Sequence, residues 1–139
     1  MTDPAFDALE TDDAFIAVLL AAMDASGHVS AAEAERAHHI IWSMRRFRHR
    51  DGDVVNRRIE RMRVLIGDEG ASPVLAAGAA KIPPPLRPAA FAVAADLVLV
   101  DGRMERAESQ FLRELAKTLG LDTPTAERIL DVIRIKNSA

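Results

Sequence analysis

Two stretches of this chain repeat one short pattern, and the repeat constrains the fold more than any other feature. Residues 25–33 read ASGHVSAAE, and residues 100–108 read VDGRMERAE. Each stretch follows an apolar segment with helical spacing and precedes another such segment. Glycine reverses the chain readily, and the glutamate six residues later suits the first turn of a helix. The sequence therefore predicts two copies of a helix, a tight turn and a second helix.

Helical spacing of apolar residues continues through most of the chain outside these turns. Aromatic residues make up only 4% of the chain and tyrosine is absent, a composition that favours helices over strands. Thr11 and Thr123 are the expected caps of the first and last helices. The segment 89–100 is apolar almost all round, which predicts a buried central helix. We expect seven helices, at about residues 12–23, 31–47, 55–66, 73–80, 89–100, 107–119 and 124–133.

Four prolines between residues 81 and 88 mark the main joint of the chain. Proline removes an amide donor and disfavours helix just before it. The joint separates two halves, about 11–69 and 84–136, and each half holds one copy of the turn. With 139 residues the chain suits one domain. We expect an all-α fold, a single compact domain over 1–139, in which two pseudo-repeated halves surround the central helix and bring the turns together.

Several function classes find no support in the sequence. The chain has no cysteine, which excludes disulfides, zinc–thiolate sites and a cysteine nucleophile. It also lacks a His-Glu-x-x-His motif, a Gly-x-Ser-x-Gly motif and a glycine-rich phosphate loop. We therefore expect no enzyme. The acidic segment 1–10 lacks the basic start and apolar stretch of a secretory signal, so a cytoplasmic protein is expected.

Oxygen-bearing side chains surround both turns with a spacing similar to that of an EF-hand calcium loop. Aligning each turn glycine with the loop glycine puts these side chains at ligand positions. They are Asp24, Ser26 and Glu33 around Gly27 in the first copy, and Asp101 and Glu108 around Gly102 in the second. Neither set is complete, so the sequence predicts at most weak binding of a divalent cation: calcium, magnesium or zinc.

A purely structural interpretation explains the same residues. Ser30 and Glu33 can form a capping box on their own helix. Asp101 and Glu108 stabilise a helix N-terminus through its dipole. Asp96 also has two interpretations, because a carboxylate within an apolar helix is costly unless it is paired or coordinating. It either forms a buried ion pair with an arginine or serves as an inward-facing metal ligand.

The two repeated stretches, followed in the second copy by FLRELA at 111–116 and LGLD at 119–122, resemble the tellurite-resistance TerB-like family. The resemblance covers nearly the whole chain. It implies a small all-helical domain of two halves, with metal bound at acidic Asp-Gly turns. It also implies a non-enzymatic stress or metal-resistance role through protein partners. Ser26 stands where the family usually has aspartate, which removes one charge from the first turn.

Arginines crowd one segment of this chain, whose formal net charge is −3. We expect a basic face made by Arg45, Arg46, Arg57, Arg58 and Arg61. With Trp42 and Phe47 nearby, this face could bind phosphates of nucleic acid or anionic lipid, or dock a protein partner. A solvated face with helix-spaced pairs such as Asp53 and Arg57 is the alternative. The second hypothesis is thus a basic-faced adaptor with structural turns, and a homo-oligomer is compatible with either hypothesis.

Overall fold

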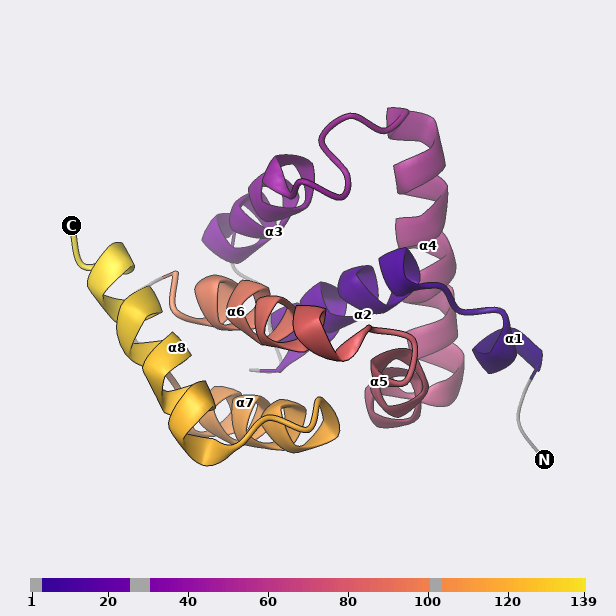
Figure 1. The fold of residues 1–139 in the computed structure, drawn as a ribbon. Coiled ribbons are helices and arrows are strands. Elements are labelled where there is room, and N and C mark those ends of the chain that lie inside the picture. Colours follow the sequence, from indigo (N-terminus) through magenta and orange to yellow (C-terminus); the bar gives the residue numbers. More distant parts are fainter. Residues whose placement is uncertain (1–3, 26–30, 101–103) are drawn as a thin grey trace.

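The computed structural model describes residues 4–25, 31–100 and 104–139. Within them the chain forms eight α-helices, one short 3-10 helix and no strand, which confirms the all-α prediction (Figure 1). The helix beyond the expected seven is α1, a single turn near the N-terminus. The elements are α1 (Pro4–Asp7), α2 (Thr11–Asp24), α3 (Ala31–Ser43), α4 (Gly52–Glu69), α5 (Ala71–Ala79), η1 (Pro84–Leu86), α6 (Arg87–Val98), α7 (Arg106–Thr118) and α8 (Thr123–Asn137).

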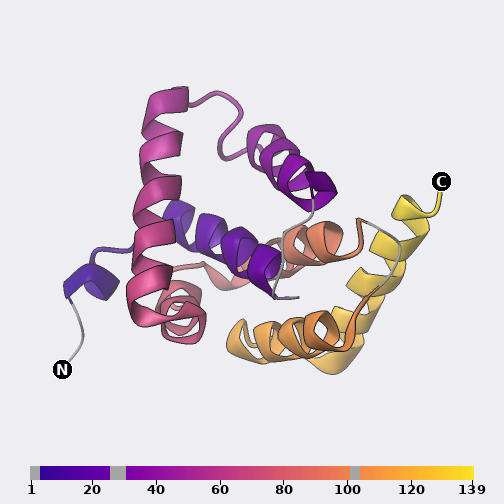
Figure 2. The ribbon, with the colours of Figure 1, turned by 180° about the vertical axis from the view of Figure 1, so that it is seen from behind.

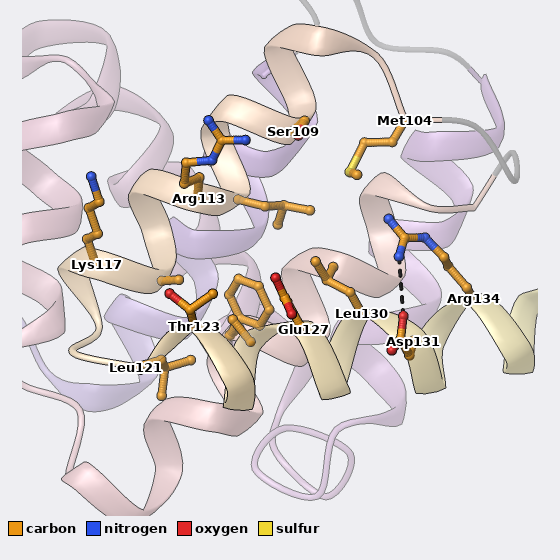
Figure 3. Close-up of a pocket in the computed structure, with 14 residues that line it drawn as sticks. Met104, Ser109, Arg113, Lys117, Leu121, Thr123, Glu127, Leu130, Asp131 and Arg134 are labelled. Atoms are coloured by element: carbon orange, nitrogen blue, oxygen red, sulfur yellow. Dashed lines mark hydrogen bonds and ion pairs between the residues drawn. The ribbon is translucent and has the colours of Figure 1, made fainter.

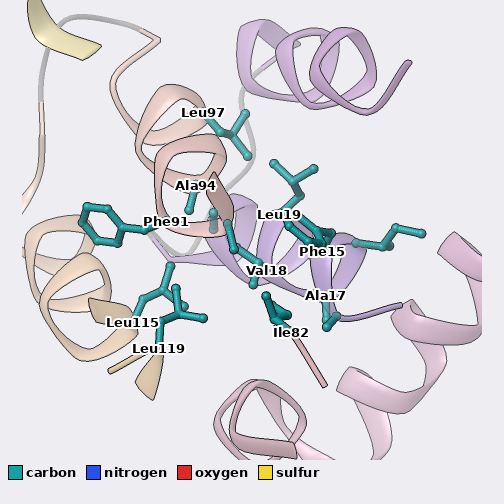
Figure 4. Packing of buried hydrophobic residues seen from close by; sticks show 14 of the residues in the cluster. Phe15, Ala17, Val18, Leu19, Ile82, Phe91, Ala94, Leu97, Leu115 and Leu119 are labelled. Atoms are coloured by element: carbon teal, nitrogen blue, oxygen red, sulfur yellow. The ribbon is translucent and has the colours of Figure 1, made fainter. Parts of the chain in front are cut away.

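Helices α2 and α6 pack against each other at the centre, with the other helices around them (Figures 1 and 2). The prediction that α6 is buried is confirmed, since Phe91, Ala94 and Leu97 are at most 1% exposed. Helix α2 shares the centre, because all residues from 12 to 19 are buried. Figure 4 shows side chains of both helices meeting in this core. Among the described helices, none has the length and apolar character of a membrane span.

The side chains that cap two helices differ from those predicted. Helix α2 is capped by Glu10 instead of Thr11, and the Asp13 carboxylate accepts the Glu10 amide at 2.9 Å to complete a capping box. Helix α8 is capped by Asp122 instead of Thr123. In both cases the cap lies one residue earlier, because a longer acidic side chain there reaches the free amides of the first turn.

The end of α3 and the start of α6 also differ from the prediction. Helix α3 ends at Ser43 instead of about Phe47, and hydrogen-bonded turns follow. The Phe47 side chain is completely buried, so tertiary packing places it inside without extending the helix. Helix α6 begins at Arg87 instead of residue 89, with Pro88 at its second position. Proline is tolerated there because the first amides of a helix have no partner within it.

The packing has the same form on both sides of the proline-rich joint. Helix α2 packs against α3 and α4, and α6 packs against α7 and α8. Helix α5 joins the two groups by packing on α2, α4 and α7. Its Gly78 allows close approach to α2, since a Cβ there would lie 3.2 Å from the Ala14 Cβ. Duplication into halves 11–69 and 84–136 stays a prediction, and this packing is what such a duplication would produce.

Candidate functional site

The centres of the two predicted turns lie outside the described residues. Ser26, Gly27, Asp101 and Gly102 are among them, as is Ser30 of the predicted capping box. The structure therefore describes the predicted site from its flanks. Asp24 is exposed at the end of α2. Glu33 and Glu108 lie in the first turn of the helices that follow the two predicted turns.

Glu33 and Glu108 occupy the same place in the two copies. Each is the third residue of its helix, α3 or α7, and each is almost completely buried, at 6% and 5% exposure. The Glu108 Oε1 accepts the Glu105 amide at 3.0 Å, and the Glu105 side chain accepts an amide in return. Glu108 therefore caps α7, as the structural interpretation expected. A carboxylate has about four acceptor positions, so capping leaves acceptor capacity on the same side chain.

The described residues do not contain a complete metal site. No group of three or more histidine, aspartate or glutamate side chains converges in residues 4–25, 31–100 and 104–139. A ligand set at either turn would therefore need Ser26 or Asp101 in addition to the flanking carboxylates. Carboxylate and hydroxyl oxygens are hard donors, so the residue types present fit calcium or magnesium better than a thiolate-seeking metal.

Asp96 forms the ion pair that one of its two interpretations expected. Its Oδ1 lies 3.0 Å from Arg36 Nη2 of α3 and 3.2 Å from Lys136 Nζ of α8, and it accepts the Asn137 side-chain amide at 3.1 Å. Three donors thus converge on one oxygen from two helices. This pairing favours the structural role and removes Asp96 from the proposed ligand set.

The protonation of Asp96 follows from these contacts. Partial burial raises the pKa of its carboxyl, but the hydrogen bonds from Asn137, Lys136 and Arg36 outweigh burial and hold the pKa below its ordinary value. The carboxylate is therefore charged at neutral pH. The Arg36 Nε is buried with no hydrogen-bond partner among the described residues, while Arg36 Nη2 also donates to the Asn137 side-chain oxygen at 3.1 Å.

Acidic side chains at the start of α2 also form ion pairs with arginines. The Asp13 side chain is completely buried and accepts hydrogen bonds from Arg58 Nη1 at 3.0 Å and Arg61 Nη2 at 2.9 Å. Burial lowers the pKa of Arg58, but the hydrogen bond and negative charge of Asp13 outweigh burial and raise it above its ordinary value. Asp13 therefore joins α2 to α4 in addition to capping α2.

Asp12 joins α2 to the segment after α3 through ion pairs. Its carboxylate lies 2.6 Å from Arg46 Nη1 and 3.3 Å from Arg50 Nη2, and its side chain is only 7% exposed. The guanidinium carbon of Arg46 also lies 5.3 Å from the centre of the Phe15 ring, within cation–π distance. Arg46 is thus held by a charge and an aromatic face of the same helix.

The predicted basic face is divided by these contacts. Its arginines that pair with α2 are Arg46, Arg58 and Arg61. Arg45 and Arg57 are exposed, and the Arg57 Nε donates to the Asp53 backbone carbonyl at 3.3 Å instead of to the carboxylate. Phe47 is completely buried, so it cannot stack on a nucleotide base. Much of the positive charge that anion binding would require is therefore neutralised within the molecule.

Sequence reasoning missed the partners of these arginines. The only local signal was the pair Asp12 and Asp13 at a predicted helix start, where acidic residues are expected for electrostatic reasons alone. Their partners lie 34 to 48 residues away in sequence. Helical periodicity predicts the helices but not which helices become neighbours. It therefore could not predict these ion pairs.

Comparison with known proteins gives one match. A family model described as tellurite resistance protein TerB matches residues 12–131, which covers most of the chain. No curated protein and no solved structure matches this chain. The matched region runs from the start of α2 into α8 and includes both turns and the aspartates Asp12, Asp13 and Asp96.

Proposed function

Because this chain belongs to the TerB family of tellurite resistance proteins, we propose that it is a non-enzymatic domain that binds a divalent cation at its two turns. In this proposal it works inside the cell through protein partners, in a stress or metal-resistance response. The cation adjusts the surface that a partner contacts.

The observation that carries the proposal is the equivalence of Glu33 and Glu108. Both follow a turn of the same sequence pattern, both are third in their helix, and both are buried. Burying a carboxylate is costly unless donors or a cation compensate for lost hydration. A pair of buried carboxylates at matched turns supports a shared role. The hydrogen bond that Glu108 accepts from the Glu105 amide means that helix capping is part of that role.

The proposed ligands are oxygen atoms from each turn and its flanks. They are Asp24, Ser26 and Glu33 at the first turn, and Asp101 and Glu108 at the second. A cation bound there would neutralise the carboxylates that gather at the turn. Incomplete ligand sets of this kind suit calcium or magnesium with a dissociation constant of about 0.1–1 mM, well above that of sensor EF-hands.

The ion pairs of α2 argue against the basic-faced adaptor as the main function. Arg46, Arg58 and Arg61 already pair with buried aspartates, so part of the positive charge that would attract phosphate is compensated. Exposed Arg45 and Arg57 remain available as part of a protein-docking face.

Calorimetric titration tests the metal proposal. We expect saturable heats with calcium or magnesium, at up to two ions per chain, and we titrate zinc and manganese for comparison, since manganese also suits oxygen ligands. The double variant Asp101→Asn with Glu108→Gln should lose the second site. Glutamine can still accept the Glu105 amide, so α7 keeps its cap.

A matched control removes the same charge elsewhere. The double variant Glu60→Gln with Asp68→Asn changes two exposed acidic residues of α4 and should bind as the parent does. If the parent gives no saturable heat with any of the four ions, or if both variants change binding equally, the turns are caps and not cation sites.

A further inference from the structure

A cavity of about 390 Å³ lies between α7 and α8, with α6 as its floor (Figure 3). Its volume falls in the range of small-molecule sites, about 300–1,000 Å³. None of the proposed cation ligands lines it, although Met104 of the second repeated stretch does. The cavity exists because α7 and α8 both pack on α6, while small Ala116 and Ala126 line the space between them.

The floor of the cavity is apolar and closely packed. Phe91 of α6 and Leu112 of α7 line it and are at most 2% exposed, so their positions are fixed by the core. Leu130 of α8 and Met104 line the cavity and are half-buried. Covering these side chains with an apolar group would remove further apolar surface from water, which is favourable.

The α7 wall carries positive charge that nothing in the described structure neutralises. Arg113 and Lys117 are four residues apart, are exposed, and form no ion pair or side-chain hydrogen bond with any residue described. Both side chains are labelled in Figure 3 on the helix opposite Glu127. Two neighbouring cations beside an apolar floor are complementary to one anionic group with an apolar body.

The α8 wall restricts where that negative charge can lie. Asp131 pairs with Arg134 at 3.5 Å, which leaves Glu127 as the acid on this wall with no ion pair or side-chain hydrogen bond to a described residue. A negative charge near Glu127 would be repelled. Arg134 of the α8 wall is already paired with Asp131, so an anionic head fits the unpaired cations of the α7 wall better, and the rest of the ligand is uncharged.

We propose that this cavity binds a free amphipathic carboxylate of the size of a medium-chain fatty acid. Arg113 and Lys117 hold the carboxylate. The chain lies over Phe91 and Leu112 and against Leu130. None of the proposed cation ligands lines the cavity, so decanoate binding is expected without a cation at the turns.

Sodium decanoate, kept below its micelle concentration, is the probe. Binding is followed by calorimetry and by the amide resonances of the ¹⁵N-labelled protein, which should shift in α7 and α8. The double variant Arg113→Gln with Lys117→Gln should bind decanoate about tenfold more weakly, because two charge-assisted contacts are lost. The control Arg106→Gln with Arg128→Gln removes two exposed cations of the same helices that do not line the cavity, and should bind within about twofold of the parent.

Two further experiments test the shape of the cavity and the sign of the ligand's charge. Ala126→Phe should fill the cavity and abolish binding. If that variant does not fold, Leu130→Gln at a half-buried position should weaken binding instead. Decyltrimethylammonium, which has the same chain and the opposite charge, should bind at least about tenfold more weakly. Equal binding of this cation, unchanged binding in the Arg113 and Lys117 variant, or resonance shifts confined to residues remote from the cavity would each overturn the proposal, as would the absence of saturable decanoate binding.

Discussion

Asp13 shows how much one side chain contributes to this fold. It has no solvent exposure, it completes the capping box of α2 with Glu10, and it accepts hydrogen bonds from Arg58 and Arg61 of α4. Leaving a buried charge without its partner costs several kcal/mol, more than the pair itself contributes. The Asp13 carboxylate is therefore expected to be among the most sensitive positions in the chain.

Asp13→Asn should lower the free energy of unfolding by about 2–4 kcal/mol, measured by urea denaturation at neutral pH. The amide keeps the size of the side chain but removes the charge that faces Arg58. Glu60→Gln is the matched control, because Glu60 and Arg63 form an exposed pair and should contribute at most about 1 kcal/mol. Equal destabilisation by the two substitutions would contradict this account of Asp13.

At Asp96, contacts join three helices. The carboxylate of α6 binds Arg36 of α3 and both Lys136 and Asn137 in the last turn of α8. The end of α8 is otherwise exposed, with Ile135 72% accessible to solvent. Asp96 is therefore the polar contact that fixes the C-terminal turn of α8 to the central helix.

The pKa of Asp96 lies below its ordinary value in the folded protein, so folding favours the charged form. The stabilisation is complete above the ordinary carboxyl pKa of about 4 and is lost as pH falls through the lower folded value. Asp96→Asn should therefore destabilise the protein by about 1–2 kcal/mol at pH 7, and the difference from the parent should shrink below about pH 4. Thermal unfolding of both proteins from pH 7 to pH 3 measures this.

Asp131→Asn is the control for this pH series. Asp131 and Arg134 form an exposed pair on the same helix, α8, at 3.5 Å. The substitution should change stability little at any pH. A difference between parent and Asp96→Asn that stays constant down to pH 3 would mean that the Asp96 charge does not carry the effect.

The pattern of helices was predictable from sequence because it depends on local spacing. Segments 89–100 and 107–119 were predicted from apolar periodicity, and the structure places α6 and α7 there with shifts of one or two residues. The boundary of α3 was predicted four residues too late, because Phe47 continues the apolar spacing while its burial comes from contacts outside the helix. An apolar residue that continues a helix and one that is buried after the helix ends therefore look alike in the sequence.

For the molecule as a whole, the sequence predicted one central helix and the structure has two. Helix α2 carries Asp12 and Asp13 at its start, and arginines from α4 and the segment after α3 pair with both carboxylates. Helices α2 and α6, which lie on opposite sides of the proline-rich joint in sequence, thus pack against each other. Of the candidate site, the sequence predicted the matched glutamates, and the ion pair was one of two interpretations of Asp96. The cavity between α7 and α8 depends on tertiary spacing that no local pattern records.

The central claim is that both turns bind a divalent cation, and an NMR titration with calcium and magnesium tests it most directly. The account predicts saturable shifts of the amide resonances that flank the turns, at Asp24 and Ala31 for the first and at Val100 and Met104 for the second, while amides of α4 stay unchanged. Shifts confined to exposed acidic residues of other helices, or no saturable shift at either turn, would contradict it.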